Sequence, residues 1–299
     1  MDTRERTWIR TKNYLPYAVL LVPAFAFYTV FGIVPVFRAI YTSTTDWSGL
    51  GTSYHFVGLA NYISLFTDTN VLWTFQATFE YTLSVTVFQN VISIILAFIL
   101  NQNLKSRNVL RSLIFMPTLF SGLIMGYIWS FLYSEPIMEL GKAIHSTVLG
   151  NNVLGSQNFA IFAAAFMDIW RGTGYTMVIY IAGLQNIPFE LEDAANIDGA
   201  NVIQRFRYLT LPLLAPATTI CVILTFERCL KNFDSIFALT AGGPGDATMV
   251  MAINIYRQSF YFQRAGYGTA IGVTLFLFIL ILSLLQLRLF KRGEENASL

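Results

Sequence analysis

Long apolar runs recur along the chain, separated by shorter segments rich in polar, glycine and proline residues. An α-helix needs about 20 mostly apolar residues to cross a bilayer. Runs near this length or longer cover residues 15–37, 79–101, 111–133, 159–185, 211–239 and 266–290. The pattern therefore predicts an all-α integral membrane protein with six transmembrane helices, and residues 1–299 are expected to form a single transmembrane domain.

The first apolar run follows a basic segment, as the apolar core of a signal peptide does. It extends from Leu15 to about Phe37, which is longer than such a core, and no small-residue cleavage site ends a shorter one. We therefore expect an uncleaved first transmembrane helix.

Lysine and arginine are divided unevenly among the segments that connect the runs. Twelve lie before the first run, in 102–111, in 186–210 or at the C-terminus from Arg288 onward, and four lie in the other three loops. Positive residues favour the cytoplasmic side of a membrane. The bias predicts that both termini and the 186–210 loop are cytoplasmic, which agrees with an even number of spans.

The composition supports a membrane protein. Hydrophobic residues make up 55% of the chain and charged residues 12%, against about 25% charged residues in soluble domains. The net charge of +2 argues neither for nor against a nucleic-acid partner, and none is expected because no basic tract is interleaved with aromatic residues. Cys221 and Cys229 share one apolar run without a nearby histidine, and we expect neither a disulfide nor a metal site.

The predicted cytoplasmic loop contains FELEDAANIDGA at residues 189–200. Pro188 suits the first turn of a helix, and the acids that follow are favoured there by the helix dipole. Gly199 suits the left-handed position that ends a helix. The loop is therefore predicted to form a short helix, a glycine corner and a second short helix. From the residues alone, it is either a solvated linker at the membrane surface or a docking element for a cytoplasmic partner.

A longer segment around this loop, IPFELEDAANIDGANVIQRFRYLTLPLLAP, resembles the EAA loop of binding-protein-dependent ABC importer permeases. That pattern runs Glu-Ala-Ala, three residues, Gly, nine residues, Ile, one residue and Leu-Pro. Here Asp193 replaces the Glu and Leu209 the Ile. Phe233-Asp234, the following LTAGGPGDAT and the closing GTAIGVTLFLFILILSLLQLRLFKR are similar to the maltose-type sugar permeases of the Gly-Gly-Pro class.

The resemblance implies the fold of a type I ABC importer permease with a cytoplasmic coupling loop at about 186–210. It also implies a complex in a prokaryotic cytoplasmic (inner) membrane, with a second permease subunit, two ATP-binding subunits and an extracytoplasmic solute-binding protein. The chain has no G-x-x-x-x-G-K-[ST] motif, so ATP and magnesium are expected on the partner ATPase and no cofactor on this chain. The residues expected to contact the ATPase are Glu190, Asp193, Ala194, Ala195, Asp198, Gly199 and Ala200.

Charged residues also fall inside the predicted spans, where a charge costs on the order of 3 kcal/mol. Asp168 and Arg171 are three residues apart, and Glu227 and Lys231 are four apart. Either the two charges of each pair neutralise each other and join helices, or the pair lines a water-filled path. Sugars are held by planar polar groups and aromatic faces. The residues predicted to line a substrate path are Asn232, Phe233, Asp234 and Trp170.

The predicted function is that of a permease subunit forming half of the path for a sugar or related polyol. A secondary transporter is the alternative, with the intramembrane acids as ion or proton sites. An enzyme is not expected, because His55 and His145 lie in predicted external loops and no H-E-x-x-H or G-x-S-x-G motif occurs. Saccharides and polyol derivatives such as glycerol-3-phosphate stay open as substrates.

Overall fold

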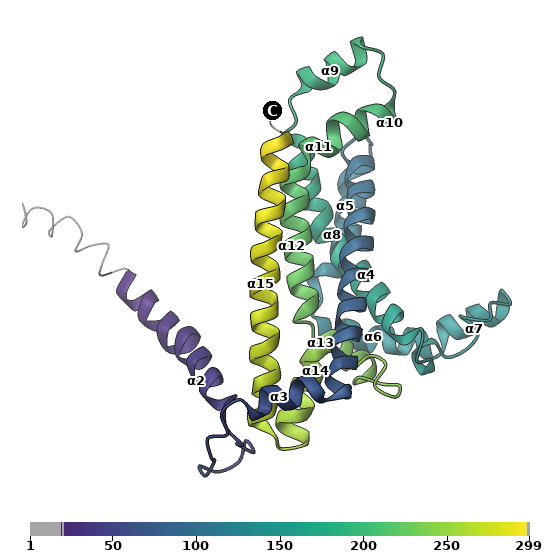
Figure 1. The fold of residues 1–299 in the computed structure, drawn as a ribbon. Helices are drawn as coiled ribbons and strands as arrows, with labels where there is room; N and C mark the ends of the chain where they lie inside the picture. The colour runs from purple at the N-terminus through teal and green to yellow at the C-terminus, as the bar shows by residue number, and fades with distance from the viewer. Residues whose placement is uncertain (1–18, 20, 298–299) are drawn as a thin grey trace, which may run out of the picture. The chain divides into compact units, whose positions relative to one another are not determined.

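The computed structural model describes residue 19 and residues 21–297, with side chains up to residue 288 (Figure 1). The beginning of the first predicted span and the basic residues before it lie outside the described residues. The chain divides into two compact units. One comprises Met1–Leu65 and Gln258–Val273, and the other comprises Phe66–Arg257 and Thr274–Leu299.

The first unit contains a helical candidate span, Leu21–Thr42, which ends with α2 (Val34–Thr42) and includes a π-helical turn, Thr29–Ile33. It ends five residues beyond the predicted boundary. The hydroxyls of the next three residues, Ser43, Thr44 and Thr45, each donate at 2.7 Å to the carbonyl three residues earlier. Such side-chain bonds compete with the backbone hydrogen bonds of a helix, and the helix therefore ends at this polar cluster.

The second unit holds most of the helices, together with the C-terminal part of the last one. Helices α4, α8 and α12 pack against one another (Figure 1). The helices that follow the first unit's α2 are α3 (Ala60–Thr67), α4 (Thr69–Leu100), α5 (Arg107–Phe115), α6 (Gly122–Ser134), α7 (Pro136–Ala143), α8 (Ala160–Gln185), α9 (Phe189–Ile197), α10 (Val202–Arg205), α11 (Leu211–Leu213), α12 (Ala215–Leu230), α13 (Asp234–Thr240), α14 (Met251–Tyr256) and α15 (Ala265–Ala297).

Contacts between these helices establish their directions. Tyr81 meets Asp168, and Gln89 meets Thr176, and both pairs are 87 residues apart. Helices α4 and α8 therefore run in the same direction. Gln89 also meets Thr225, whereas Tyr81 meets the later Asn232, so the chain through α12 runs in the opposite direction. The predicted alternation of the second, fourth and fifth spans implies the same relation.

The predicted count of six spans is not confirmed by length and composition. Among the described residues, three helices are long and apolar enough to cross a membrane: Leu21–Thr42, Thr69–Leu100 and Ala265–Arg288. Two bent helix pairs raise this number to five if each pair is one span. Helix α8 has 26 residues, about 39 Å at 1.5 Å per residue. It is long enough, but Asp168, Arg171 and its glycine and threonine residues lower its hydropathy.

The third predicted span, 111–133, is not one straight helix. The segment Arg107–Leu119 and the pair of helices that follows it are bent by 99°. Pro117 lies in a short 3-10 turn, and Ser121 adopts an extended backbone. Proline removes a helical hydrogen bond, and the Ser121 hydroxyl accepts a bond from the Ile124 N–H at 3.3 Å, which starts α6. The break follows from these two residues.

The fifth predicted span, 211–239, is also interrupted. It bends by 68° where α11 meets α12, beside Pro212 and Pro216. Helix α12 ends at Leu230, and a new helix begins at Asp234. The predicted path residues Asn232 and Phe233 therefore lie in a break between helices. The Asn232 side chain does not face lipid there, because it bonds to Ser235 and to Asp168 on α8.

Helices α6 and α13 approach closely at Gly126. A Cβ atom there would lie 2.5 Å from the Ser235 carbonyl oxygen and 2.6 Å from the Ala238 Cβ. A glycine is needed because the atoms on the α13 side are backbone and Cβ, which cannot rotate away. Ser235 belongs to the polar cluster described below, so this contact also sets the position of α13.

We predict that Gly126→Ala destabilises the protein by about 1–3 kcal/mol, the usual cost of overpacking a core. The measurement is the thermal unfolding midpoint in detergent. Gly155→Ala is the matched control, because a Cβ there would be 3.4 Å from its nearest neighbour, the Asn152 side chain. Equal midpoints for the two variants would contradict the close contact of α6 with α13.

Candidate functional site

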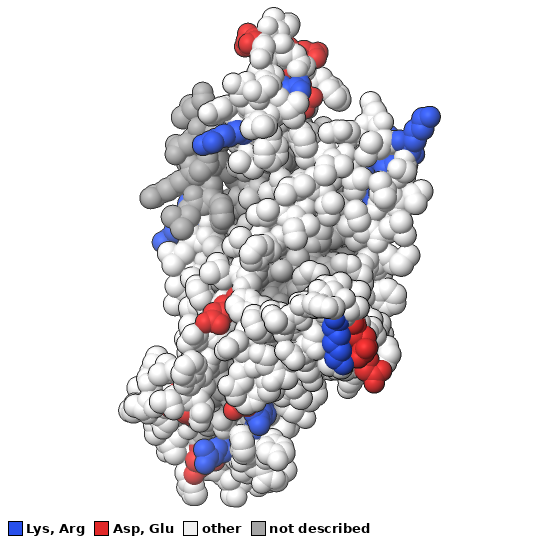
Figure 2. All heavy atoms as spheres, turned by 90° about the vertical axis from the view of Figure 1, so that its right-hand side faces the viewer, with Lys and Arg blue, Asp and Glu red and all other residues white. Residues whose placement is uncertain are grey.

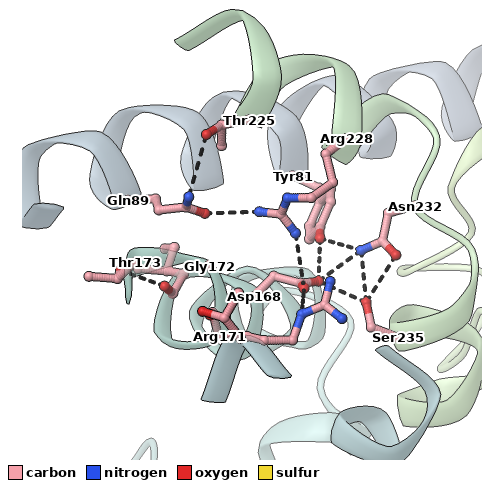
Figure 3. A network of polar contacts seen from close by, with 12 residues as sticks. Tyr81, Gln89, Asp168, Arg171, Gly172, Thr173, Thr225, Arg228, Asn232 and Ser235 are labelled. Atoms are coloured by element: carbon pink, nitrogen blue, oxygen red, sulfur yellow. Dashed lines mark hydrogen bonds and ion pairs between the residues drawn. The ribbon is translucent and has the colours of Figure 1, made fainter. Parts of the chain in front are cut away.

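A buried carboxylate on α8, that of Asp168, is the centre of the most connected polar cluster in the second unit (Figure 3). Its Oδ2 accepts a short hydrogen bond from the Tyr81 hydroxyl. The same oxygen accepts bonds at 2.8 Å from the Asn232 amide and from the Ser235 hydroxyl. One atom therefore connects α4 and α8 with the break between α12 and α13.

Two arginines share the other oxygen of this carboxylate. The Arg171 Nε lies 3.2 Å and the Arg228 guanidinium 3.5 Å from Asp168 Oδ1. Arg228 also donates to the Gln89 side-chain oxygen at 2.9 Å. The predicted contact between Asp168 and Arg171 is present, but Arg228 makes it a group of one anion and two cations. A buried ion is tolerated only when it is paired and hydrogen-bonded, and this arrangement meets that requirement for Asp168.

A polar stripe on α4 continues from this cluster along the helix. Gln89 donates to the Thr176 and Thr225 hydroxyls at 3.3 and 3.4 Å, and the Ser93 and Thr176 hydroxyls are 2.5 Å apart. The buried polar side chains of the stripe are Thr74, Thr78, Thr82, Thr86, Gln89, Asn90 and Ser93. Our sequence analysis did not single them out, although polar residues recurring every three or four positions in an apolar run are the signal for such a face.

The structure separates the predicted path residues Asn232, Phe233 and Asp234. Asn232 belongs to the Asp168 cluster, and the Phe233 ring stacks on Phe237 with the centroids 4.9 Å apart. Asp234 is exposed, and no hydrogen bond or ion pair reaches its side chain from the described residues. The predicted pair of Glu227 with Lys231 is present, with the two side chains 2.5 Å apart.

The fourth predicted path residue, Trp170, lies against another aromatic side chain. It is half-exposed on α8, and its ring meets that of Trp129 edge to face with the centroids 5.6 Å apart. It is not among the residues that line the two cavities beside the Asp168 cluster.

Those two cavities have different volumes and partly different walls. The Asp234 cavity, of about 410 Å³, is lined by Arg171, Leu224, Glu227, Arg228, Lys231, Asn232, Phe233 and Asp234. The Thr225 cavity, of about 200 Å³, is lined by Gln89, Thr118, Arg171, Gly172, Tyr175, Thr176, Leu224, Thr225 and Arg228. Such polar walls can accept hydroxyl-rich ligands or water. No group of three or more metal-ligating side chains occurs among the residues that the structure describes.

The acidic loop forms the predicted helix–glycine–helix. Helix α9 begins after Pro188, which takes the N-cap position instead of the first turn, and Gly199 has a φ of +75°. Asn201 and Gln204 then form a reciprocal cap at 2.8 and 2.9 Å that starts α10. At the end of the molecule that carries α9, Figure 2 shows clustered Asp and Glu above a mostly uncharged surface.

The residues predicted to contact an ATPase share this exposed corner. Those exposed are Glu190, Asp193, Ala194, Asp198 and Gly199, and those half-buried are Ala195 and Ala200. Large apolar side chains are exposed beside them, with Phe189 80% and Ile197 87% accessible. The loop thus combines acids with apolar side chains that the described part of this chain leaves uncovered.

Comparison with known proteins identifies the family. Residues 89–293 match the family described as binding-protein-dependent transport system inner membrane component. The chain belongs to this family. The match includes most of the Asp168 cluster, both cavities and the acidic loop. The family is one of membrane transport components, not of enzymes, which agrees with the expectation from the sequence.

Individual relatives of this binding-protein-dependent transport component align over nearly their whole length. This chain is 34% identical to the probable starch degradation products transport system permease protein AmyD of Thermoanaerobacterium thermosulfurigenes, over 95% of this chain and 96% of that one. It is also 34% identical to the multiple sugar-binding transport system permease protein MsmF of Streptococcus mutans, over 94% and 97%.

The fold is similar to that of a chain in the bacterial alginate ABC transporter, solved in complex with an alginate pentasaccharide-bound periplasmic protein. The TM-score is 0.81 at 19% identity, over 97% of this chain and 98% of that one. The helical architecture of this family member is therefore that of an ABC importer permease.

We predict that Asp168→Asn destabilises the permease by about 3–5 kcal/mol, because two partly buried arginines lose the anion that they share. Adding Arg228→Gln should recover part of this loss by removing one uncompensated charge. Tyr81→Phe, which removes the two hydrogen bonds of the Tyr81 hydroxyl with Asp168 and Asn232, is the matched control and should cost about 2 kcal/mol. Thermal unfolding midpoints of the purified variants test the order; additive losses in the double variant would contradict the ion cluster.

Proposed function

We propose that this chain is the permease subunit of an ABC importer and forms half of the translocation path for a sugar or related polyol. The observation that carries the proposal is the acidic helix α9, exposed and ended by a left-handed Gly199, in a chain that belongs to a binding-protein-dependent transport family. Such a knob is suited to a groove on a cytoplasmic ATPase, with its acids meeting basic residues.

The proposed architecture has six spans, with α8 among them, in one transmembrane domain over residues 1–299. Both termini and the 186–210 loop are cytoplasmic, and the membrane is the inner membrane of a prokaryote. The partners are a second permease subunit, two ATP-binding subunits that carry ATP and magnesium, and an extracytoplasmic solute-binding protein. ATP-driven closure of the ATPases moves the loop, and the rigid helices rock between two states.

The proposed substrate is a saccharide, and the Asp234 cavity is its proposed position in this subunit. The relatives AmyD and MsmF carry starch-degradation and sugar transport in their names. The cavity offers the free Asp234 carboxylate as an acceptor for hydroxyls and the Phe233 ring as an apolar face. Asn232 orients this wall through Asp168, and Trp170 is proposed to lie farther along the path.

Membership of the family favours this function over an ion-coupled secondary transporter. Two of the intramembrane acids also favour it. Asp168 is held by two arginines, and Glu227 is held by Lys231. Carboxylates that are already paired are poorly suited to bind and release a coupling ion, because the arginines and the lysine compete with it.

The test of the proposed coupling is Gly199→Val. A β-branched residue is strongly disfavoured at a φ of +75°, so the corner between α9 and α10 should change. A Cβ there would meet no atom within 4 Å, so the effect comes from the backbone and not from a clash. We expect substrate-stimulated ATPase activity of the assembled complex to fall at least about tenfold, the change for about 1.4 kcal/mol of lost coupling.

Gly51→Val is the control for that substitution, because Gly51 also has a positive φ, +70°, and also has open space around it, but lies far along the chain from the loop. It should leave stimulated ATPase activity near that of the parent. Full stimulation in Gly199→Val would remove the basis for assigning the loop to coupling.

The proposed sugar contact is tested with Asp234→Asn and Asp234→Leu. The first keeps the shape and some hydrogen bonding, and the second removes both charge and polar atoms. We expect Asp234→Leu to abolish uptake, with assembly and basal ATPase activity retained, and Asp234→Asn to be milder. Wild-type uptake by both variants would exclude Asp234 as a binding residue, and failure of both to assemble would make it a structural residue.

A further inference from the structure

The Asp234 and Thr225 cavities meet at a small set of shared side chains. Three residues line both: Arg171, Leu224 and Arg228. The two arginines are held in place by the same buried carboxylate, and their side chains are only 17% and 33% exposed. The boundary between the cavities is therefore made of two anchored guanidinium groups and one leucine.

The two cavities lie one after the other along the helices. On α8, the further residues that line the Thr225 cavity follow Arg171 in the chain, towards the end that leads to α9. On the antiparallel α12, both linings reach back to Leu224, but only the lining of the Asp234 cavity extends forward past Arg228, to Asp234 itself. Moving along either helix from the Asp234 cavity towards the α9 end leads past the arginines into the Thr225 cavity.

The charges at this boundary are unequal. Asp168 faces two arginines, which leaves one positive charge in excess, whereas Lys231 is matched by Glu227 in the wall of the Asp234 cavity alone. Arg228 is also held by Gln89 from α4. Removing Arg228 would thus leave a balanced Asp168–Arg171 pair and would open the boundary on the α12 side.

We propose that Arg171 and Arg228, anchored on Asp168, form a gate between two successive polar cavities of the translocation path. The inference rests on the proposed function, because it treats both cavities as parts of one path. The arginines act as positioning residues: they hold the boundary closed, and a change in the angle between α8 and α12 moves them apart. Asp168 stays bound to Tyr81 and Ser235 during this movement and keeps the site polar.

Accessibility of single cysteines tests the gate in the assembled complex in its membrane. In a background with Cys221→Ala and Cys229→Ala, one variant carries Asp234→Cys and the other Thr225→Cys. A membrane-impermeant thiol reagent is applied to each membrane face in turn, without ATP or sugar. We expect position 234 to react from the outer face at least about tenfold faster than position 225. If the boundary is closed in most molecules, the reagent reaches position 225 only in the open minority.

Adding Arg228→Gln should raise the rate at position 225 from that face at least about tenfold, because glutamine is shorter and uncharged. Lys231→Gln is the matched control: it removes one cation that lines the Asp234 cavity only, and should leave position 225 unchanged. If Arg228→Gln does not reach the membrane, Arg171→Gln takes its place with the same expectation.

The gate would be overturned by equal rates at positions 225 and 234 with both arginines present, by equal acceleration with the Lys231 control, or by no acceleration with either arginine variant. Failure of position 234 to react from the outer face would also overturn it. The labelling measurement needs no transported sugar. A chain that imports another solute would thus still show the gate, and a sugar importer without the gate would fail this test but pass the uptake tests.

Discussion

The buried charge of Asp168 is the constraint on which most of the second unit depends. A carboxylate without solvent access must be paired and hydrogen-bonded, or the fold loses several kcal/mol. Here the partners come from α4, α8, α12 and the start of α13. Satisfying one side chain therefore requires these segments to meet at one depth. Within a bundle where apolar packing alone discriminates weakly between helix positions, this requirement specifies a register.

The same constraint explains why the chain departs from straight spans at this place. Asn232 can reach Asp168 and Tyr81 only because α12 has ended at Leu230. The close approach of α6 at Gly126 then supports the new helix α13 that carries Ser235. The break exposes Phe233 and Asp234 to the cavity, while the Asn232 N–H donates to the Cys229 carbonyl at 3.2 Å and the Phe233 carbonyl accepts from the Phe237 N–H at 2.9 Å. Irregular backbone within a membrane is tolerated in such surroundings.

The acidic loop obeys a different rule from the bundle. Its form depends on local signals: Pro188 before α9, acids in the first turn, a left-handed Gly199 and the cap of Asn201 with Gln204. None of these needs a distant partner. The loop can therefore keep its shape while the helices to which it is attached change their angles, which is what a coupling element requires.

The sequence by itself determined the helical class, the approximate limits of the apolar segments, the form of the 186–210 loop and the contact of Asp168 with Arg171. Each of these depends on neighbours within a few residues, or on the total hydropathy of a run. The two bends could in part be predicted from Pro117, Pro212 and Pro216, but the angles of the bends depend on what the helices pack against.

Only the tertiary structure decided that Tyr81, Gln89, Arg228 and Ser235 belong to the Asp168 cluster, that Asn232 serves it and that Asp234 has no counter-ion among the described residues. These residues are up to about 150 positions apart in the chain, as Tyr81 and Asn232 are. Helical spacing predicts which side of a helix they occupy but not which helix faces them. The choice is made by the energetic need of a buried charge for partners, which is a property of the packed bundle and not of any segment.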